Sequence, residues 1–448
     1  MPNFKVIIAG GGPAGLIAAH SLSKAGIDFV VLERRPEVLE DVGASLVVFP
    51  HNMRVLSQFG LLPKLREIGH EVLRWSDFTQ YGLARESWYM YLIKANHGAF
   101  SLMTHRAELV QALYESLSDE DRARIHTGKK LASIESNSGG VVVTCEDGTS
   151  YEGSIVIGAD GVHSATRRIM RDVSLKASPD AVVNDEKPFS VEYKTMWCTL
   201  PRLHEYAPGD HNITHGDTAS LQLLNASKRS WIFLYEKLDG EPQERVTYTE
   251  ADMEAFAAKH GDMAVGNLLK LKDIFPKRLG GGMANLEEGV LKQWSGGRIV
   301  LVGDAAHKYT PNAGLGLNNG IQDVVALVNE LHRCVESVGR GTSPSQDELS
   351  GAFRRYQEAR WAKAQADYEM SAHTTRLCAW PNTIYWLFDQ YVMRRLPYAN
   401  ELLVKYSVSP KIADAFCLDF VEGEEPFQGD VPWVHPMRKS QALLEKTA

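Results

Sequence analysis

Two glycine-rich stretches, almost three hundred residues apart, carry the residues best suited to chemistry in this chain. Residues 303–323 read GDAAHKYTPNAGLGLNNGIQD and follow an apolar run at 298–302 that predicts a buried parallel strand. A helical pattern continues from this loop to about Cys334. Gly314 and Gly316 let backbone N–H groups approach a ligand, because a Cβ atom there holds the ligand off. With the positive end of the helix behind it, the loop predicts a site for an anionic or electron-rich ligand.

The second stretch is a dinucleotide-binding signature. Residues 4–9 predict a strand, Gly10-Gly11-Gly12-Pro13-Ala14-Gly15 fits G-x-G-x-x-G, and a helix opens directly after it. The next strand ends at Glu33, about 20 residues further on, where an acid accepts hydrogen bonds from an adenosine ribose. Gly10 is expected to form the tight turn, Gly12 to let the backbone approach the pyrophosphate, and Gly15 to let helix and strand pack closely.

A third glycine turn lies at the end of another predicted strand, at residues 155–161 (IVIGADG), and Ser164 and Arg167 follow it. Asp160 is in a position to order a cofactor loop. Taken alone, such a turn is more often only a turn.

Composition limits the class of protein. The length of 448 residues predicts two or three domains, and 48 basic against 56 acidic residues give a net charge of −8 without a basic block. This argues against nucleic acid as a partner. No signal peptide is expected at the first strand, and five scattered cysteines indicate reduced thiols in a cytoplasmic protein.

No run of 18 apolar residues exists, so no membrane span is expected. Residues 380–392 (WPNTIYWLFDQYV) are aromatic and amphipathic. We expect them to pack against the body of the protein, with contact to a membrane surface as the alternative.

The order of the predicted elements indicates an α/β protein with a Rossmann-like nucleotide-binding domain, an inserted sheet-based substrate domain and a helical carboxyl-terminal region. The first part of the nucleotide domain is expected at 1–175 and the substrate domain at 176–290. The chain then returns to the first domain at 291–350. The helical region is expected at 351–448 and becomes irregular near its proline-containing end.

The three motifs together resemble the FAD-dependent monooxygenases of the p-hydroxybenzoate hydroxylase type. The resemblance rests on three motifs, numbered in chain order: the first is GGGPAGL at 10–16, the second is GADGVHSATR at 158–167 and the third is GDAAH…P…GLGLN at 303–318. They stand in the family's order and at its separations. Further stretches look like the fungal enzymes that oxidise indole alkaloids, indole diterpenes and meroterpenoids. These stretches are ERR at 33–35, DVGASLVVFPHNMRVL at 41–56 and LDFVEGEEPFQGDVPW near the end.

The resemblance implies a set of FAD-contacting residues in addition to the glycines and Glu33. Arg34 is adjacent to the adenosine site, and Arg106 contacts the cofactor from the helix that it opens. Asp304 binds the ribityl or pyrophosphate region. The remaining expected contacts to the flavin come from Val47, Gly314, Gly316, Leu317 and the helix that begins near Asn318. Pro311 is expected beside the flavin carbon that reacts.

The resemblance also implies the reaction. NADPH, or NADH, reduces FAD as a transient co-substrate, and O2 adds to the reduced flavin to give a C4a-hydroperoxide. Its electrophilic oxygen then passes to an electron-rich carbon–carbon double bond, either an indole C2=C3 bond or a prenyl or terpenoid olefin of a bulky natural product. Hydroxylation of a phenol ring and dehydrogenation without oxygen insertion are the alternatives. A protein of this fold that only binds a nucleotide is a third, and a protein without yellow colour would favour it.

The candidate catalytic side chains are Tyr193 and Lys194, on the first strand of the inserted domain. The family has a tyrosine–arginine pair there that points toward the substrate, and a lysine cannot reproduce a guanidinium fork. A packing or surface role is the alternative for both residues. His211 and His215 are four apart but lack the acidic residue of a helical metal motif, so no metal is expected. His307 is expected to be a structural part of its turn.

Aromatic residues concentrate in the sequence around the proposed substrate side. Core packing is the ordinary role of each one, but together they fit a large apolar ligand. The residues concerned are Trp75, Trp88, Tyr89, Tyr91, Trp197 and Trp231.

Overall fold

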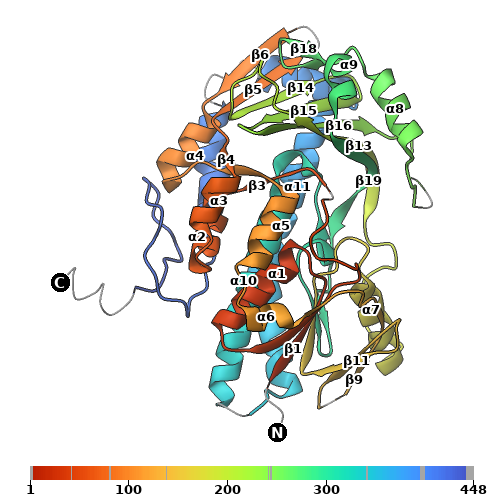
Figure 1. The fold of residues 1–448 in the computed structure, drawn as a ribbon, viewed down its shortest axis with the longest axis vertical. Helices are drawn as coiled ribbons and strands as arrows, with labels where there is room; N and C mark the ends of the chain where they lie inside the picture. Colours follow the sequence, from red (N-terminus) through yellow and green to blue (C-terminus); the bar gives the residue numbers. More distant parts are fainter. Residues whose placement is uncertain are drawn as a thin grey trace, which may run out of the picture.

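A mainly parallel sheet forms the lower half of the molecule in Figure 1. The structure is a computed structural model that describes residues 4–439, apart from 42, 80–81, 138, 241, 243–244, 340–341 and 394–398. The predicted strand–helix–strand unit is β1 (Lys5–Ala9), α1 (Pro13–Lys24) and β2 (Asp28–Leu32). β1 pairs in parallel with β2 on one side and with β12 (Ile155–Gly158) on the other, and β12 pairs in parallel with β21 (Ile299–Leu301). All three glycine motifs therefore leave the sheet at the same edge, as binding sites in such sheets require.

The sheet continues outward to β20 (Ser295–Gly296) and β8 (Ile125–His126), in the order β20-β21-β12-β1-β2-β8. The apolar faces of its strands share one large core with α1 and the long helix that follows the third motif. The runs Val6-Ile7-Ile8 and Ile299-Val300-Leu301 are fully buried there, which is what a parallel strand covered on both faces needs.

An eight-stranded sheet forms the other end of the molecule. Its order is β22-β19-β13-β16-β15-β14-β5-β6. Five of these strands come from the predicted inserted domain, and β22 comes from the expected return at 291–350. β5 and β6 come from residues 74–87, which the expected boundary at 175 assigns to the first domain. The bounds are β5 (Arg74–Thr79), β6 (Gly82–Ser87), β13 (Ser190–Pro201), β14 (Asp210–His215), β15 (Ala219–Asn225), β16 (Arg229–Lys237), β19 (Gly280–Val290) and β22 (His307–Lys308).

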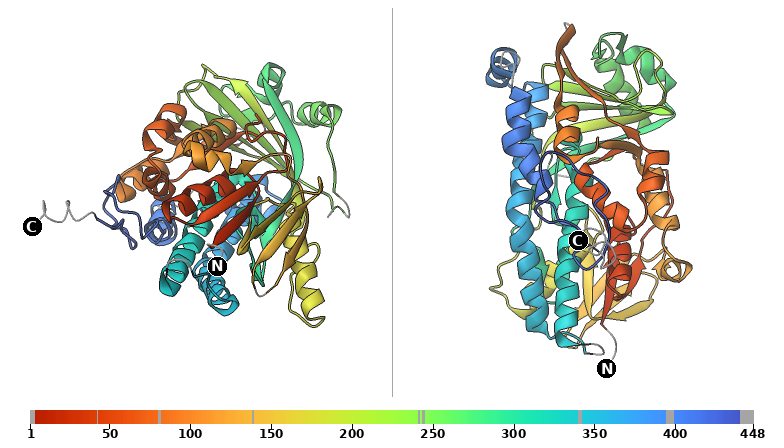
Figure 2. Two further views of the ribbon diagram at one scale, coloured as in Figure 1. Left: turned by 60° about the horizontal axis from the view of Figure 1, so that its bottom comes forward. Right: turned by 90° about the vertical axis from the view of Figure 1, so that its left-hand side faces the viewer.

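Two long helices run side by side in the lower half of the molecule, and the second of them continues to the eight-stranded sheet. They are α10 (Leu315–Val338) and α11 (Gln346–Ala379), and the right-hand view of Figure 2 shows them next to each other. α11 begins at a capping box in which Ser345 and Glu348 satisfy each other's backbone N–H groups. The helix therefore starts before the expected boundary at 351, and the domain division as a whole stays a prediction.

Shorter elements complete the fold. The amino-terminal half adds β3 (Ser45–Val48), α2 (Pro50–Gln58), α3 (Leu62–Ile68), β4 (His70–Glu71), α4 (Tyr89–His97), β7 (Leu102–His105), α5 (Arg106–Glu115), α6 (Asp119–Ala123), β9 (Leu131–Ser136), β10 (Val141–Cys145), β11 (Ser150–Gly153) and α7 (Ala165–Ala177). The carboxyl-terminal half adds α8 (Glu250–Lys259), β17 (Ala264–Val265), β18 (Leu269–Lys270), α9 (Leu271–Ile274), η1 (Phe275–Lys277), η2 (Gly303–Ala305), η3 (Pro311–Ala313), α12 (Thr383–Leu387), η4 (Phe388–Met393), α13 (Ala399–Leu403), η5 (Val404–Val408) and α14 (Ser409–Ala413).

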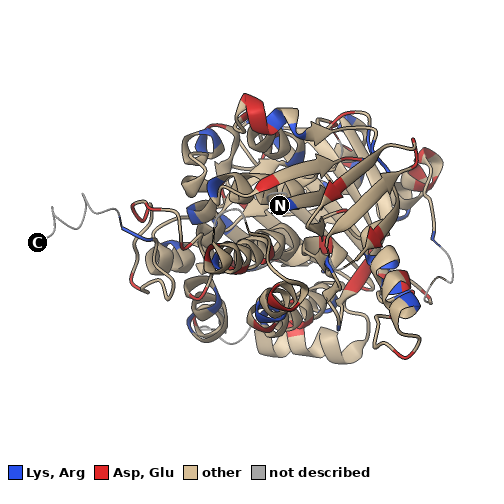
Figure 3. Cartoon of the chain, turned by 90° about the horizontal axis from the view of Figure 1, so that it is seen from below, with Lys and Arg blue, Asp and Glu red and all other residues tan. Residues whose placement is uncertain are grey.

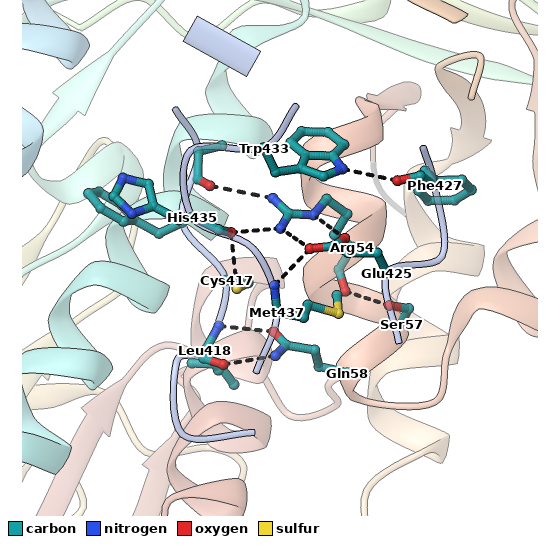
Figure 4. Close-up of polar contacts among 12 residues, drawn as sticks. Arg54, Ser57, Gln58, Cys417, Leu418, Glu425, Phe427, Trp433, His435 and Met437 are labelled. Carbon is teal, nitrogen blue, oxygen red and sulfur yellow. Dashed lines mark hydrogen bonds and ion pairs between the residues drawn. The ribbon is translucent and has the colours of Figure 1, made fainter. Parts of the chain in front are cut away.

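The described chain ends in an irregular strap, residues 414–439, that lies against α2 and α10. Gln58 donates to the Leu418 carbonyl at 2.9 Å, Asn329 to the Cys417 carbonyl at 2.9 Å, and Gln322 to the Phe416 carbonyl at 3.1 Å. Figure 4 shows the part of this strap that meets α2. The strap thus holds the two helices that support the predicted flavin loop.

Charges of both signs are interspersed over the elements seen from below in Figure 3. In the part of the chain that the structure describes, no helix is long and apolar enough to cross a membrane. Within 380–392, Trp380 is buried, but Ile384 is 77% exposed and Tyr391 50% exposed. The expected packing of this segment therefore holds for its first residue and not for these two, and a membrane contact stays a prediction.

Candidate active site

A cavity of about 650 Å³ opens where the three glycine motifs leave the six-stranded sheet. Its walls come from the β1–α1 turn, the end of β2, the β12–α7 turn, α5 and the start of α10. Nine of the predicted cofactor residues line it: Gly10, Gly12, Glu33, Arg34, Arg106, Asp160, Asp304, Gly316 and Leu317.

The glycines of the first motif fit a nucleotide cradle. Gly10 has φ +107°, and a Cβ atom on it would lie 2.5 Å from the Ala159 carbonyl oxygen. A Cβ atom on Gly15 would lie 1.9 Å from the Gly10 carbonyl oxygen, so α1 packs on β1 only because this residue is glycine. A Cβ atom on Gly12 meets no other atom within 4 Å and would project into open space. The tight turn at Gly10 and the close packing at Gly15 are observed, and the approach of a pyrophosphate to Gly12 stays a prediction.

Glu33 is held in place by backbone donors. One carboxylate oxygen accepts from the Gly11 N–H at 2.6 Å and the other from the Arg35 N–H at 2.9 Å. The side chain is 6% exposed and lines the cavity. A carboxylate has about four lone-pair positions, so each oxygen can still accept a ribose hydroxyl.

Asp160 orders the turn between β12 and α7. Its carboxylate accepts from the Ser164 hydroxyl and from the Thr166 N–H at 2.9 Å, which fixes the start of α7. Arg167, one turn into the helix, donates to the Val162 carbonyl at 2.7 Å and to the Ala305 carbonyl at 3.1 Å. The guanidinium group of Arg167 thereby connects the turn at 155–161 to the loop at 303–318. The sequence motif did not indicate this contact.

The predicted flavin loop, residues 303–318, is anchored from below by Asp323. This fully buried carboxylate accepts from the Gly303 N–H at 3.0 Å, from His307 Nε2 at 2.5 Å and from Arg360 Nε at 2.9 Å. Burial alone would raise the pKa of Asp323, but His307 and Arg360 lower it. His307 is therefore a structural part of the turn, as expected, and not a residue that faces the cavity.

Two charged residues, Asp304 and Arg106, line the cavity beside this loop. Asp304 forms an ion pair with Lys308, four residues later. Arg106 lines the cavity from the first turn of α5, and its own N–H donates to the Ala44 carbonyl at 2.9 Å. Burial and then the nearby Arg35 lower the pKa of Arg106, while Asp304 and Glu33 oppose this shift.

Asn318 positions the loop and faces away from the first cavity. Its amide nitrogen donates to the Val47 carbonyl at 2.8 Å and to the Gly314 carbonyl at 2.7 Å, and its amide oxygen accepts from the Phe49 N–H at 3.0 Å. Gly314 has φ +66° and is the N-cap of α10. The side chain of Asn318 thus joins β3 to the start of this helix.

A second cavity, of about 1100 Å³, adjoins the first and is lined by more apolar and aromatic side chains. It holds three more predicted cofactor residues, Val47, Gly314 and Asn318, together with Pro311, whereas Gly15 lines neither cavity. The residues that line both cavities are Leu46, Arg106, Asp304, Gly316 and Leu317. A ring system that reaches from the first cavity into the second must pass these five residues.

One wall of the second cavity is a face of the eight-stranded sheet. Successive side chains on a strand alternate between faces, so His211, Ile213 and His215 of β14 share this face with the adjacent pairs of β5 and β15. Those pairs are Trp75 and Asp77, and Gln222 and Leu224. The opposite wall is α11, where Asp367, Met370, Thr374, Leu377 and Cys378 line the cavity.

A buried charged cluster lies within this wall. Arg85 donates to Asp77 at 2.6 Å, and His215 Nδ1 lies 3.1 Å from the carboxylate of Asp389 in η4. Burial alone would lower the pKa of His215, but Cys378, Asp389 and Asp77 raise it well above its usual range. Among the described residues, no three His, Cys, Asp or Glu side chains are placed to hold a metal ion.

Lys194 and Tyr193 do not line either cavity. Lys194 forms an ion pair with Glu236 at 2.8 Å and lies over the ring of Phe256 in α8, on the far face of the sheet. Strand alternation is the reason, because Met196, two residues on, packs into the same far-side core. The ring of Tyr193 is buried against Tyr235 and Leu286. This placement gives no support to the expected contact of Tyr193 and Lys194 with the substrate and fits the alternative packing role.

The aromatic residues divide between the cavity, the core and the surface. Trp75 and Tyr89 line the second cavity, with ring centroids 5.2 Å apart. Trp231 is buried, while Trp88 is 69% exposed and Tyr91 is 45% exposed. Of this group, only the pair on β5 and α4 can meet a ligand in the second cavity.

Comparison with known proteins shows the family to which the chain belongs. Residues 3–344 match the model of the FAD binding domain. The chain belongs to the family of FAD-dependent monooxygenases that carry this domain. It is 32% identical over 427 residues to the FAD-dependent monooxygenase esdpE of Penicillium shearii, which covers 94% of this chain and 86% of that protein. It is 33% identical to the FAD-dependent monooxygenase srdH of Neurospora crassa, over 96% of this chain and 98% of that protein.

Solved structures share the fold of the monooxygenase. HpxO of Klebsiella pneumoniae, complexed with FAD and uric acid, superposes with a TM-score of 0.71 at 20% identity, over 91% of this chain and 96% of that one. The Diels-Alderase PyrE3 superposes with a TM-score of 0.65 at 22% identity, over 90% of this chain and 79% of that one. The expected α/β fold, the enzyme class and the FAD cofactor are confirmed.

Proposed function

We propose that the enzyme uses NAD(P)H and O2 to epoxidise or hydroxylate an electron-rich carbon–carbon double bond of a bulky, mainly apolar secondary metabolite. The observation that carries this proposal is the 1100 Å³ cavity that shares Leu46, Arg106, Asp304, Gly316 and Leu317 with the nucleotide cavity. This volume lies at the upper end of the range for small-molecule sites, and it fits a polycyclic or prenylated substrate. Bound FAD, once reduced, supplies an electrophilic oxygen derived from O2.

The residues of the chain would divide the work as follows. The Gly10–Gly12 turn and the start of α1 would bind the pyrophosphate, and Glu33 would accept the ribose hydroxyls. The N-terminus of α10 at Gly314 would stabilise negative charge on the reduced ring, because backbone N–H groups there have no helical acceptors. Residues of α11 and of the eight-stranded sheet would orient the substrate and exclude water from the reacting atoms.

The unit that binds substrate is proposed to be residues 176–290 together with 74–87, since β5 pairs with β14 over six residues. The five cysteines are free and buried, which fits the cytoplasm or another reducing compartment.

The test uses purified enzyme, NADPH and 18O2, with a prenylated indole alkaloid and a prenylated polyketide in separate reactions read by mass spectrometry. Gain of one labelled oxygen at a former double bond is the expected result. Label on a carbon of a phenol ring, in place of an olefinic carbon or an indole C2 or C3, would mean phenol hydroxylation. If the substrate loses two hydrogens, gains no label and reduces the flavin, the reaction is a dehydrogenation. Either of these outcomes contradicts the proposal.

A further inference from the structure

His211 lines the second cavity and is connected to the predicted flavin loop through one other residue of that cavity, Gln222. Gln222 Nε2 lies 2.6 Å from His211 Nε2 and also donates to the carbonyl oxygen of Asn312, at 3.3 Å. Asn312 directly follows Pro311, and both residues line the second cavity. His211 is thus connected to the loop through one amide group.

The orientation of the Gln222 amide is fixed from both ends. The Asn312 carbonyl only accepts, so the nitrogen of the amide must face it. At the other end, the Tyr235 hydroxyl donates to the amide oxygen at 3.1 Å. The second N–H of the amide then points at His211 Nε2, which must be the unprotonated nitrogen of the ring.

The proton of the neutral imidazole is therefore on Nδ1. Burial lowers the pKa of His211 to about 4, although Asp77 acts in the opposite direction, so the ring is neutral near pH 7. The ring lies against Trp75, with centroids 4.5 Å apart. The Nδ1 atom has no hydrogen-bond partner among the described residues, on a side chain that lines the substrate cavity.

Apart from Arg106, which stands at the boundary with the nucleotide cavity, the strongly charged side chains that line the described part of this wall form ion pairs. A substrate with its own net charge would therefore enter that part of the cavity without a built counter-ion. The pairs are Arg85 with Asp77, Lys308 with Asp304, Arg360 with Asp323, Lys363 with Asp414, Lys411 with Asp367 and His215 with Asp389.

We infer that His211 presents Nδ1–H to the substrate as a neutral hydrogen-bond donor, and that the preferred substrate is an uncharged molecule with an oxygen acceptor, such as a ketone, near its reacting double bond. This inference rests on the proposed function and narrows it. An indole offers an N–H donor at the reacting ring and does not satisfy this group, whereas an oxygenated prenyl or terpenoid compound does. Gln222 is a positioning residue, because it selects the tautomer of His211.

The test compares two probes that differ in one group, farnesylacetone and the hydrocarbon in which its C=O is replaced by CH2. Binding to the FAD-loaded enzyme is measured from the perturbation of the flavin absorbance, which needs no turnover. We expect the ketone to bind about tenfold more tightly, because the hydrocarbon leaves a buried donor without a partner. Equal affinities, or no binding of the ketone, would overturn the inference without any variant.

Three variants assign the effect to the residue. His211→Phe should remove the preference for the ketone, and His211→Asn, whose amide nitrogen can replace Nδ1, should restore part of it. His260→Gln is the matched control, because His260 is bonded to Glu236 on the far face of the same sheet; it should keep the full preference. A preference that persists in His211→Phe would assign it to another group and overturn the inference. Incorporation of 18O is measured in the same variants to separate the proposed reaction from the proposed role of His211. A preference for the ketone that depends on His211, without labelled product, would contradict only the proposed reaction.

Discussion

The guanidinium of Arg54 is fully buried and makes a two-point contact with the carboxylate of Glu425, at 2.8 and 2.5 Å, across 371 positions of the chain. The same guanidinium donates to the His435 carbonyl at 2.7 Å and lies 4.0 Å from the ring centroid of Trp433 (Figure 4). One side chain of α2 therefore contacts the carboxyl-terminal strap at two places, at Glu425 and at Trp433 and His435. The strap in turn contacts Gln322 of α10, the helix that begins at the flavin loop.

Glu425→Gln should destabilise the enzyme by about 3 kcal/mol, because it leaves a buried guanidinium without a counter-charge. Thermal unfolding of the FAD-free protein measures the effect as a lower melting temperature. Glu424→Gln, at the exposed neighbouring position, is the control and should have little effect. Equal melting temperatures for the two variants would show that the strap does not depend on this ion pair.

Replacement of Gly12 by alanine should weaken FAD binding, whereas replacement of Gly15 by alanine should destabilise the protein. Gly12→Ala places a methyl group in the open cavity, so we expect at least a tenfold loss of FAD affinity with the stability of the FAD-free protein unchanged. Gly15→Ala drives a methyl group into the Gly10 carbonyl, so the FAD-free protein itself should lose about 1–3 kcal/mol. Flavin absorbance after reconstitution and melting of the FAD-free protein separate the two results. Unchanged FAD binding in Gly12→Ala would mean that the pyrophosphate lies elsewhere.

Asp304→Ala should lose bound flavin or most of its turnover. The substitution removes a carboxylate that both cavities share and leaves Lys308 without its ion-pair partner. Flavin content and NADPH oxidation are the measurements, with Asp239→Ala, an exposed residue after β16, as the control. Normal flavin content and activity in Asp304→Ala would show that the flavin loop has been misplaced.

Thr374→Trp should block the substrate cavity and leave the nucleotide cavity intact. Thr374 lines only the larger cavity, from α11 between Met370 and Cys378. We expect normal FAD content, at least a tenfold lower kcat/KM for a bulky substrate, and NADPH oxidation that yields H2O2 in place of product. Glu369→Trp, on the exposed side of the same helix, controls for the added ring and should retain turnover. Full activity of Thr374→Trp would place the substrate outside this cavity.

Local patterns predicted the part of the fold that binds the nucleotide. The Gly10–Gly15 turn, Glu33 at the end of β2 and the loop before α10 are set by neighbours in sequence, since a strand, a turn and a helix follow one another directly. The irregular end of the chain was expected from its composition and is observed after α14.

The substrate side was less predictable, because its contacts join distant parts of the chain. No local signal shows that Trp75 will pair with His211, or that residues 74–87 will join a sheet otherwise built from 190–308. A signal for the orientation of Lys194 was present, however. Met196, Cys198 and Leu200 alternate in step with it and form an apolar face. Applied to β13, strand alternation places Lys194 on that face and away from the cavity.

Three buried histidines should make the enzyme less stable as the pH falls from 6.5 toward 4. Burial lowers the pKa of His51 to about 3 and the pKa values of His97 and His211 to about 4. Below pH 6.5 the unfolded chain binds protons at these positions and the folded protein does not, so the free energy of unfolding decreases as the pH is lowered. Each histidine contributes on the order of 1–3 kcal/mol to this loss. His215 acts in the opposite direction, because its raised pKa stabilises the fold below pH 6.5 and loses its effect at higher pH.

Melting of the FAD-free protein at pH 7.5 and pH 5.0 measures the difference, which should be smaller in His97→Gln than in the wild type. His204→Gln, at an exposed position, should leave it unchanged. A melting temperature that is the same at both pH values would mean that the three rings are not buried as neutral groups, or that His215 outweighs them. Repeating the pair of measurements in His215→Gln decides between these two causes, because loss of the opposing group should make the acid destabilisation larger.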